Sequence, residues 1–80
     1  MPRFFFHVWD TNAFVADPDG SDLPDDAAAK EEALANARGI MLDGQRRGED
    51  RRGWLVEVRD DADHTIMTVQ VSQAEPPSPT

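Results

Sequence analysis

Hydrophobic and polar positions along the chain follow two different periods, and each period predicts a different type of element. Four segments are rich in aromatic and β-branched residues or alternate apolar with polar positions, as β-strands do; they are residues 3–9, 13–16, 54–59 and 64–71. Residues 24–47 instead repeat apolar side chains at three- and four-residue spacing, with Leu34, Ala37 and Met41 on one stripe. The pattern therefore predicts the order β-β-α-β-β.

Charged and turn-forming residues mark the ends of the predicted helix. Acidic Asp25-Asp26 lie in its first turn and basic Arg46-Arg47 in its last, an order that the helix dipole favours at both ends. Either Asp22 or Asp25 can serve as the N-cap, and Gly48 is a natural terminator. Residues 17–22 are all of turn-favouring types and are expected to form a loop.

These elements predict an α+β fold in which one four-stranded, mainly antiparallel sheet carries a single helix on one face. Strand alternation assigns these side chains to the face under the helix: Phe4, Phe6, Val8, Trp54, Val56, Val58, Met67, Val69 and Val71. No pattern in the sequence sets the order of the strands. Residues 1–72 are expected to form one domain, and residues 73–80, which contain three prolines, a disordered tail.

The opposite face of the predicted sheet is also rich in apolar residues. A two-layer domain with one helix would leave these side chains uncovered: Phe5, His7, Trp9, Leu55 and Ile66. Because large exposed apolar patches usually mark interfaces, we predict that they bind a protein partner or a second copy of the chain. A homodimer that only buries the face is one alternative, and a cover formed by residues 16–23 or by the tail is another.

Composition and charge restrict the classes of partner. The chain has 80 residues and a formal net charge of −8, from 16 acidic and 8 basic side chains. This charge repels nucleic acid and anionic membrane surfaces, so neither is an expected partner. There is no cysteine, which excludes disulfides and thiolate metal sites. No signal-peptide core and no stretch of about twenty apolar residues is visible, so a cytoplasmic location is expected.

Three blocks of the sequence together resemble one family. The chain begins Met1-Pro2-Arg3-Phe4-Phe5-Phe6-His7-Val8, continues with Gly20 and Asp22-Leu23-Pro24-Asp25, and later has Gly53-Trp54 followed by Val56-Glu57-Val58-Arg59-Asp60. In this order, over residues 1–71, the blocks resemble an uncharacterised family of short bacterial proteins, a domain of unknown function that begins Met-Pro-Arg-(Tyr/Phe)-Phe-Phe. The resemblance implies a bacterial cytoplasmic protein without an established activity and carries over no catalytic residue. The chain departs from the family at residues 60–64, where a glycine is usual in the turn.

His7 is the residue most suited to acid–base chemistry. It shares the second face with Trp9 and Glu57, and a histidine beside a carboxylate can act as an acid, a base or a switch. The motifs of nucleophilic, zinc and phosphate-loop enzymes are all missing, and no nucleophile stands out. We therefore interpret His7 as a hydrogen-bonded or interfacial side chain and expect no catalytic residue. A small acid–base enzyme is the third hypothesis.

Four arginines form a basic cluster between the helix and the third strand. Such a cluster could bind a phosphate or an acidic partner, which makes a small-molecule or anion-binding domain the second hypothesis. Glu49 and Asp50 interrupt the cluster and partly neutralise it, so surface ion pairs are the simpler interpretation. The candidate anion-binding residues are Arg46, Arg47, Arg51 and Arg52.

Five aspartates within ten residues could offer oxygen ligands to Ca²⁺ or Mg²⁺. These are Asp17, Asp19, Asp22, Asp25 and Asp26. Their spacing does not match a calcium-binding loop, because Asp22 stands where such a loop needs glycine. A solvated acidic loop is the expected structure, and no metal and no cofactor is predicted.

Overall fold

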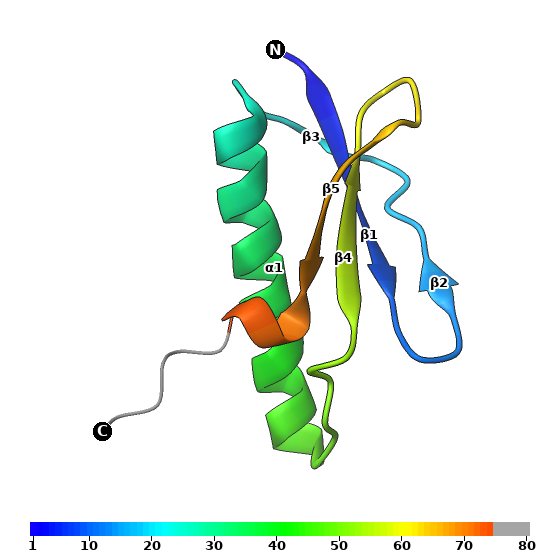
Figure 1. Cartoon of the computed structure of the whole chain (residues 1–80), viewed down its shortest axis with the longest axis vertical. Coiled ribbons are helices and arrows are strands. Elements are labelled where there is room, and N and C mark those ends of the chain that lie inside the picture. The colour runs from blue at the N-terminus through cyan, green and yellow to red at the C-terminus, as the bar shows by residue number, and fades with distance from the viewer. Residues whose placement is uncertain (75–80) are drawn as a thin grey trace.

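A computed structural model describes residues 1–74 and places one helix beside an antiparallel sheet (Figure 1). The α+β prediction is confirmed. The elements are β1 (Arg3–Trp9), β2 (Phe14–Val15), β3 (Ser21–Asp22), α1 (Asp26–Arg47), β4 (Leu55–Arg59), β5 (Thr65–Gln70) and the 3₁₀ turn η1 (Val71–Ala74). Residues 75–80, which hold most of the predicted tail, lie outside the described residues.

Helix α1 begins and ends at residues with suitable capping chemistry. The Asp25 carboxylate accepts the Ala28 N–H at 2.8 Å, so Asp25 and not Asp22 is the N-cap. Gly48 ends the helix in the left-handed conformation, with φ at 72°, as predicted from its type. The buried side of α1 is lined mainly by small residues, which lets the helix lie close to the sheet: Ala29, Ala33, Ala37, Met41 and Gly44.

The order of the strands, which the sequence did not set, is β2-β1-β4-β5. Each neighbouring pair is antiparallel, and the first long strand lies beside β4 in the middle of the sheet. The β1–β4 register pairs Phe6 with Val58, His7 with Glu57 and Val8 with Val56. His7 and Glu57 therefore lie next to each other on the second face, as strand alternation predicted.

The outer edge of β1 is covered by residues 10–22, which we call the strap. Strands β2 and β3 are two residues each, and they pair with different ends of β1, Val15 with Val8 and Ser21 with Phe4. Strand β3 was predicted as loop, because two polar residues give no strand pattern. Between β2 and β3 the Asp17 carboxylate accepts the outward Phe6 N–H at 3.2 Å, so a side chain replaces the missing strand.

The hydrophobic core lies between α1 and the sheet. The helix packs against β4, β5 and η1. Val71 and Ala74 of η1 are buried in this core. The sequence predicts Val71 as the end of the last strand and Ala74 as part of the tail. The buried set is Phe4, Phe6, Ala29, Ala33, Ala37, Met41, Val56, Val58, Val69, Val71 and Ala74. Val8, predicted in this core, is only half-buried.

A bulge near the start of β5 corrects one predicted position. The register shifts between Val58 and Arg59, so that Thr65 rather than Ile66 lies opposite Arg59. Ile66 is half-buried and packs against the core, whereas strand alternation placed it on the second face. At the other end of β5 the Gln73 side chain accepts the Gln70 N–H at 2.7 Å.

The turn between β4 and β5, where the sequence departs from the pattern it resembles, is closed without a glycine. Asp63 occupies the left-handed region with φ at 64° and donates its N–H to the Asp60 carbonyl at 3.1 Å. The Asp60 carboxylate accepts the N–H groups of Ala62 and His64. The aspartates therefore stabilise the turn, although a non-glycine residue adopts an unfavourable backbone conformation.

Candidate functional site

The second face of the sheet arranges its side chains in three cross-strand rows. The first is Phe14, Trp9, Leu55 and Gln70; the second is His7, Glu57 and Thr68; the third is Phe5, Arg59 and Thr65. The predicted residues Phe5, His7, Trp9 and Leu55 thus share this face, and Thr65 takes the position predicted for Ile66. We call Phe14, Trp9 and Leu55 the apolar row.

Glu57 is the centre of a hydrogen-bond network on this face. Its carboxylate accepts bonds from Arg59 at 2.9 Å, from the Thr65 hydroxyl at 2.6 Å and from the Trp9 indole at 2.9 Å, and the residue is only 8% exposed. The bond from the Arg59 guanidinium is the main cause that lowers the pKa of Glu57 to about 2. The bonds from Thr65 and Trp9 lower this pKa further, whereas burial acts to raise it. Glu57 is therefore a fixed anion with a structural role and not an acid that exchanges protons near neutral pH.

His7 is buried and is held by the strap rather than by Glu57. It is 7% exposed, and its Nδ1 accepts the Asp17 N–H at 2.9 Å. Its ring stacks at 6.3 Å on Phe5 and lies 5.1 Å from the ring of Phe14. The Glu57 oxygens bond to other side chains, so the His7–Glu57 acid–base pair of the third hypothesis is not formed.

Asp17 fixes the strap to β1 at the same point. Its carboxylate accepts the N–H groups of Phe6, Asp19 and Gly20, each at 3.2 Å. Burial opposes ionisation of this carboxyl, but the three backbone donors outweigh burial and lower its pKa. The acidic loop is therefore not simply solvated at this position, and its first aspartate acts as a connector between strap and sheet.

The strap covers part of the face that was predicted to be exposed. Phe14 lies 4.5 Å from Trp9 between ring centroids, and the Arg59 guanidinium lies 5.4 Å from the Phe14 ring. Phe5 is half-buried and His7 is buried, while Trp9 and Phe14 stay 41% and 39% exposed. The aromatic part of the second face that stays open is thus the Trp9–Phe14 pair, which lies beside the half-buried Leu55. Sequence reasoning missed Phe14, although its place opposite Trp9 in a hairpin was a usable signal.

The arginine cluster is engaged by acidic groups of its own surroundings. Arg51 is the buried member, with a side chain 10% exposed, and it bonds to Asp43 at 2.9 Å and Glu49 at 3.0 Å. Its guanidinium also lies 4.5 Å from the Trp54 ring centre, and its NH1 donates to the Ile40 carbonyl. Arg51 therefore connects the end of α1 to the loop before β4.

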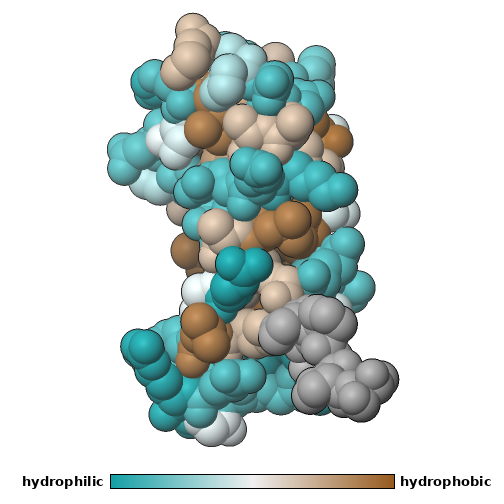
Figure 2. Space-filling view, turned by 90° about the vertical axis from the view of Figure 1, so that its left-hand side faces the viewer, coloured by the Kyte–Doolittle hydropathy of each residue, from teal (hydrophilic) through white to brown (hydrophobic). Residues whose placement is uncertain are grey.

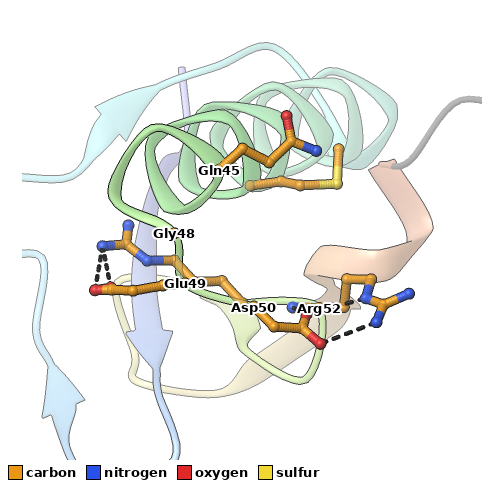
Figure 3. Close-up of a pocket in the computed structure, with 7 residues that line it drawn as sticks. Gln45, Gly48, Glu49, Asp50 and Arg52 are labelled. Carbon is orange, nitrogen blue, oxygen red and sulfur yellow. Dashed lines mark hydrogen bonds and ion pairs between the residues drawn. The ribbon is translucent and has the colours of Figure 1, made fainter.

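A hollow of about 410 Å³ lies beside this loop, between the end of α1 and residues 48–52 (Figure 3). Arg52 faces it and pairs with Asp50 at 2.9 Å, which holds the pKa of Asp50 at about 2. Arg47 pairs with Asp43, and Arg46 is exposed on the last helical turn. An anion entering the hollow would meet Glu49 and Asp50 as well as the two arginines, so the geometry gives the second hypothesis little support.

Comparison with known proteins decides the family. The sequence profile of a domain of unknown function, DUF6894, matches residues 3–72. The chain belongs to the DUF6894 family. The predicted membership of an uncharacterised family is thereby confirmed, and the description of DUF6894 assigns no activity. No curated protein and no solved structure is significantly similar to the chain.

Outside the second face, the described surface of this DUF6894 chain shows no large apolar patch on α1 and no arranged metal ligands. The face formed by α1 is largely hydrophilic, with small separate apolar patches (Figure 2). Within residues 1–74, no helix is long and apolar enough to cross a membrane. In the same range, no group of three or more histidine or acidic side chains is arranged to hold a metal ion. Of the five clustered aspartates, Asp22 pairs with Arg3 and Asp25 caps α1.

Proposed function

We propose that the protein is a small non-enzymatic module that associates through the apolar row, in the first place with a second copy of itself. The main support is that Trp9 and Phe14, two large aromatic residues in mutual contact, are each about two-fifths exposed next to Leu55. Exposed aromatic side chains gathered at one place are typical of interfaces.

The charge distribution is compatible with a second copy on this surface. The net charge of −8 repels two chains at long range, but no charged residue stands in the apolar row itself. Next to the apolar row, Glu57 is paired with Arg59, which is also paired with Asp63, so the carboxylate beside the row has a cationic partner. Apolar burial can therefore act there without placing an unpaired charge in the interface.

The polar groups that could act in catalysis are already bound in hydrogen bonds and ion pairs within the domain, which argues against catalysis as the main role. Glu57 is saturated by three side-chain donors, His7 is bonded to the strap, and Arg51 is bound by two acids. Groups that already hold their partners in this way stabilise the domain and are not free to act on a substrate. On the described part of the second face, the exposed aromatic side chains of the apolar row are available for recognition.

Leu55→Glu tests the proposal without breaking the polar network. Trp9→Glu is unsuitable because Trp9 donates to Glu57, and Ile66→Glu is unsuitable because Ile66 packs against the core. Light scattering over a dilution series should show a dimer for the native chain and a monomer for Leu55→Glu. Circular dichroism checks that the variant is folded.

Leu42→Glu is the matched control, since Leu42 is 46% exposed on α1 and receives the same change. It should leave the mass unchanged. A native chain that is monomeric at all concentrations, or equal effects of the two substitutions, would contradict the proposal.

A further inference from the structure

The strap is held to the second face at few points. Strands β2 and β3 contribute only two paired residues each, and the middle of the strap is fixed through Asp17. Gly20 lies so close to the sheet that a Cβ there would be 2.9 Å from Phe5. Elements with so few backbone bonds belong to the least stable part of a fold. The state of the Asp17 connection therefore decides how firmly the strap lies on the face.

One of the bonds at Asp17 exists in a single protonation state of His7. The Nδ1 atom accepts the Asp17 N–H, which requires a neutral imidazole that carries its proton on Nε2. A protonated imidazole has N–H groups at both ring nitrogens and cannot accept this bond. Two N–H groups would then face each other 2.9 Å apart, and one of them must move.

The charged groups around His7 are already used by other partners. Glu57 and Arg59 on β4 are paired with each other, and β5 contributes the uncharged Thr68 to this part of the face. Asp17 on the strap is the remaining neighbour, and its carboxylate is bound by three backbone donors. A positive charge on His7 would attract both carboxylates, but neither can reorient toward it without losing bonds that it has.

We propose that His7 is a pH-sensitive latch, whose protonation releases the middle of the strap from β1 and uncovers Phe5 and His7 beside the apolar row. Release would enlarge the surface used in the proposed function, and this part of the inference rests on that function. The latch itself depends on one chain only, and its test needs no association.

Amide hydrogen exchange measured by NMR on the full-length chain tests the latch. As the pH is lowered until His7 is protonated, we expect the protection factor of the Asp17 amide to fall about five- to tenfold, the factor that corresponds to one hydrogen bond. The fall should follow the pH at which the His7 imidazole signals change. A titration of His7 that leaves the protection of Asp17 unchanged would overturn the inference.

Two variants sharpen the measurement. In His7→Asn the side-chain oxygen can replace Nδ1 as an acceptor but does not titrate, so the protection of Asp17 should become independent of pH in the range where native His7 titrates. His64→Asn is the control, because His64 is exposed in the turn before β5, and it should behave like the native chain.

A pH-dependent loss that persists in His7→Asn would also overturn the latch. If His7→Asn does not fold, the native titration decides alone. Light scattering reports association separately, so failure of the latch and failure of the proposed function can be told apart.

Discussion

Replacing Glu57 with glutamine would remove the negative charge at the centre of the second face while keeping the size of the side chain. Arg59, Thr65 and Trp9 all donate to the two carboxylate oxygens in the native chain. Glutamine keeps one acceptor oxygen and presents an NH₂ group in place of the other, so at least one donor loses its partner. The free energy of unfolding should therefore fall.

The pKa of Glu57 sets the size of the effect. It drops from an ordinary 4.5 to about 2 in the folded chain. A carboxyl with a lowered folded pKa stabilises the fold above its unfolded pKa, and this stability is lost as the pH falls through the folded value. Because each pKa unit between the unfolded and folded values corresponds to roughly 1.4 kcal/mol, Glu57 contributes on the order of 3 kcal/mol to the free energy of unfolding at pH 7. About half should remain at pH 3, and little below about pH 2.

Urea unfolding followed by circular dichroism at pH 7 and pH 3 measures this directly. Glu57→Gln should lose roughly 2–3 kcal/mol at pH 7, a large share of the roughly 5–15 kcal/mol that stabilises a typical domain, and about half as much at pH 3. Glu31→Gln, at an exposed position on α1, is the control and should change stability by less than about 0.5 kcal/mol. A loss of the same size at both pH values would refute the electrostatic reasoning, because packing effects do not depend on the charge of the carboxyl.

Three further sets of substitutions test the backbone in thermal or urea unfolding. Gly39→Ala should add about 1 kcal/mol, because a Cβ there meets nothing within 4 Å. Gly44→Ala should lose stability, because its Cβ would lie 2.8 Å from the Arg51 side chain; equal effects at the two sites would contradict this. Gly20→Ala should cost more than about 2 kcal/mol, since φ is +71° and three atoms lie 2.9 Å from the new Cβ; a neutral result would mean that the strap adapts. Asp63→Gly should add up to about 1 kcal/mol by removing the cost of a φ of 64°, and a loss would show that the ion pair of Asp63 is worth more.

The helix and the longer strands of this fold could be predicted because each follows from a local pattern, whereas the two-residue β3 and the 3₁₀ turn η1 have no such pattern. Alternation along β1 and the apolar stripe of α1 depend only on which face of a regular element meets the core. The end of the helix at Gly48 follows from residue type and position, whereas residue type left the N-cap open between Asp22 and Asp25. Such features depend on the next few residues of the chain, so a single sequence is enough to identify them.

The site could be predicted only in part, because its decisive contacts join residues that are far apart in sequence. Strand alternation placed His7, Glu57 and Trp9 on one face, but nothing local indicates that Phe14 lies over His7 or that Asp17 takes the place of a strand. The bulge opposite Arg59 is likewise not indicated by any local pattern in the sequence. One extra residue in β5 moves Ile66 to the core and brings Thr65 to Glu57, although the sequence alternates regularly.

Both edges of the sheet carry a side chain that occupies an outward backbone N–H. Asp17 does so at Phe6 on the β1 edge, and Gln73 does so at Gln70 on the β5 edge, where the bulge also breaks the regular spacing of backbone groups. An extended segment of another molecule would therefore meet an interrupted row of backbone donors on either described edge. This interruption disfavours strand addition, which is the step by which fibrils grow.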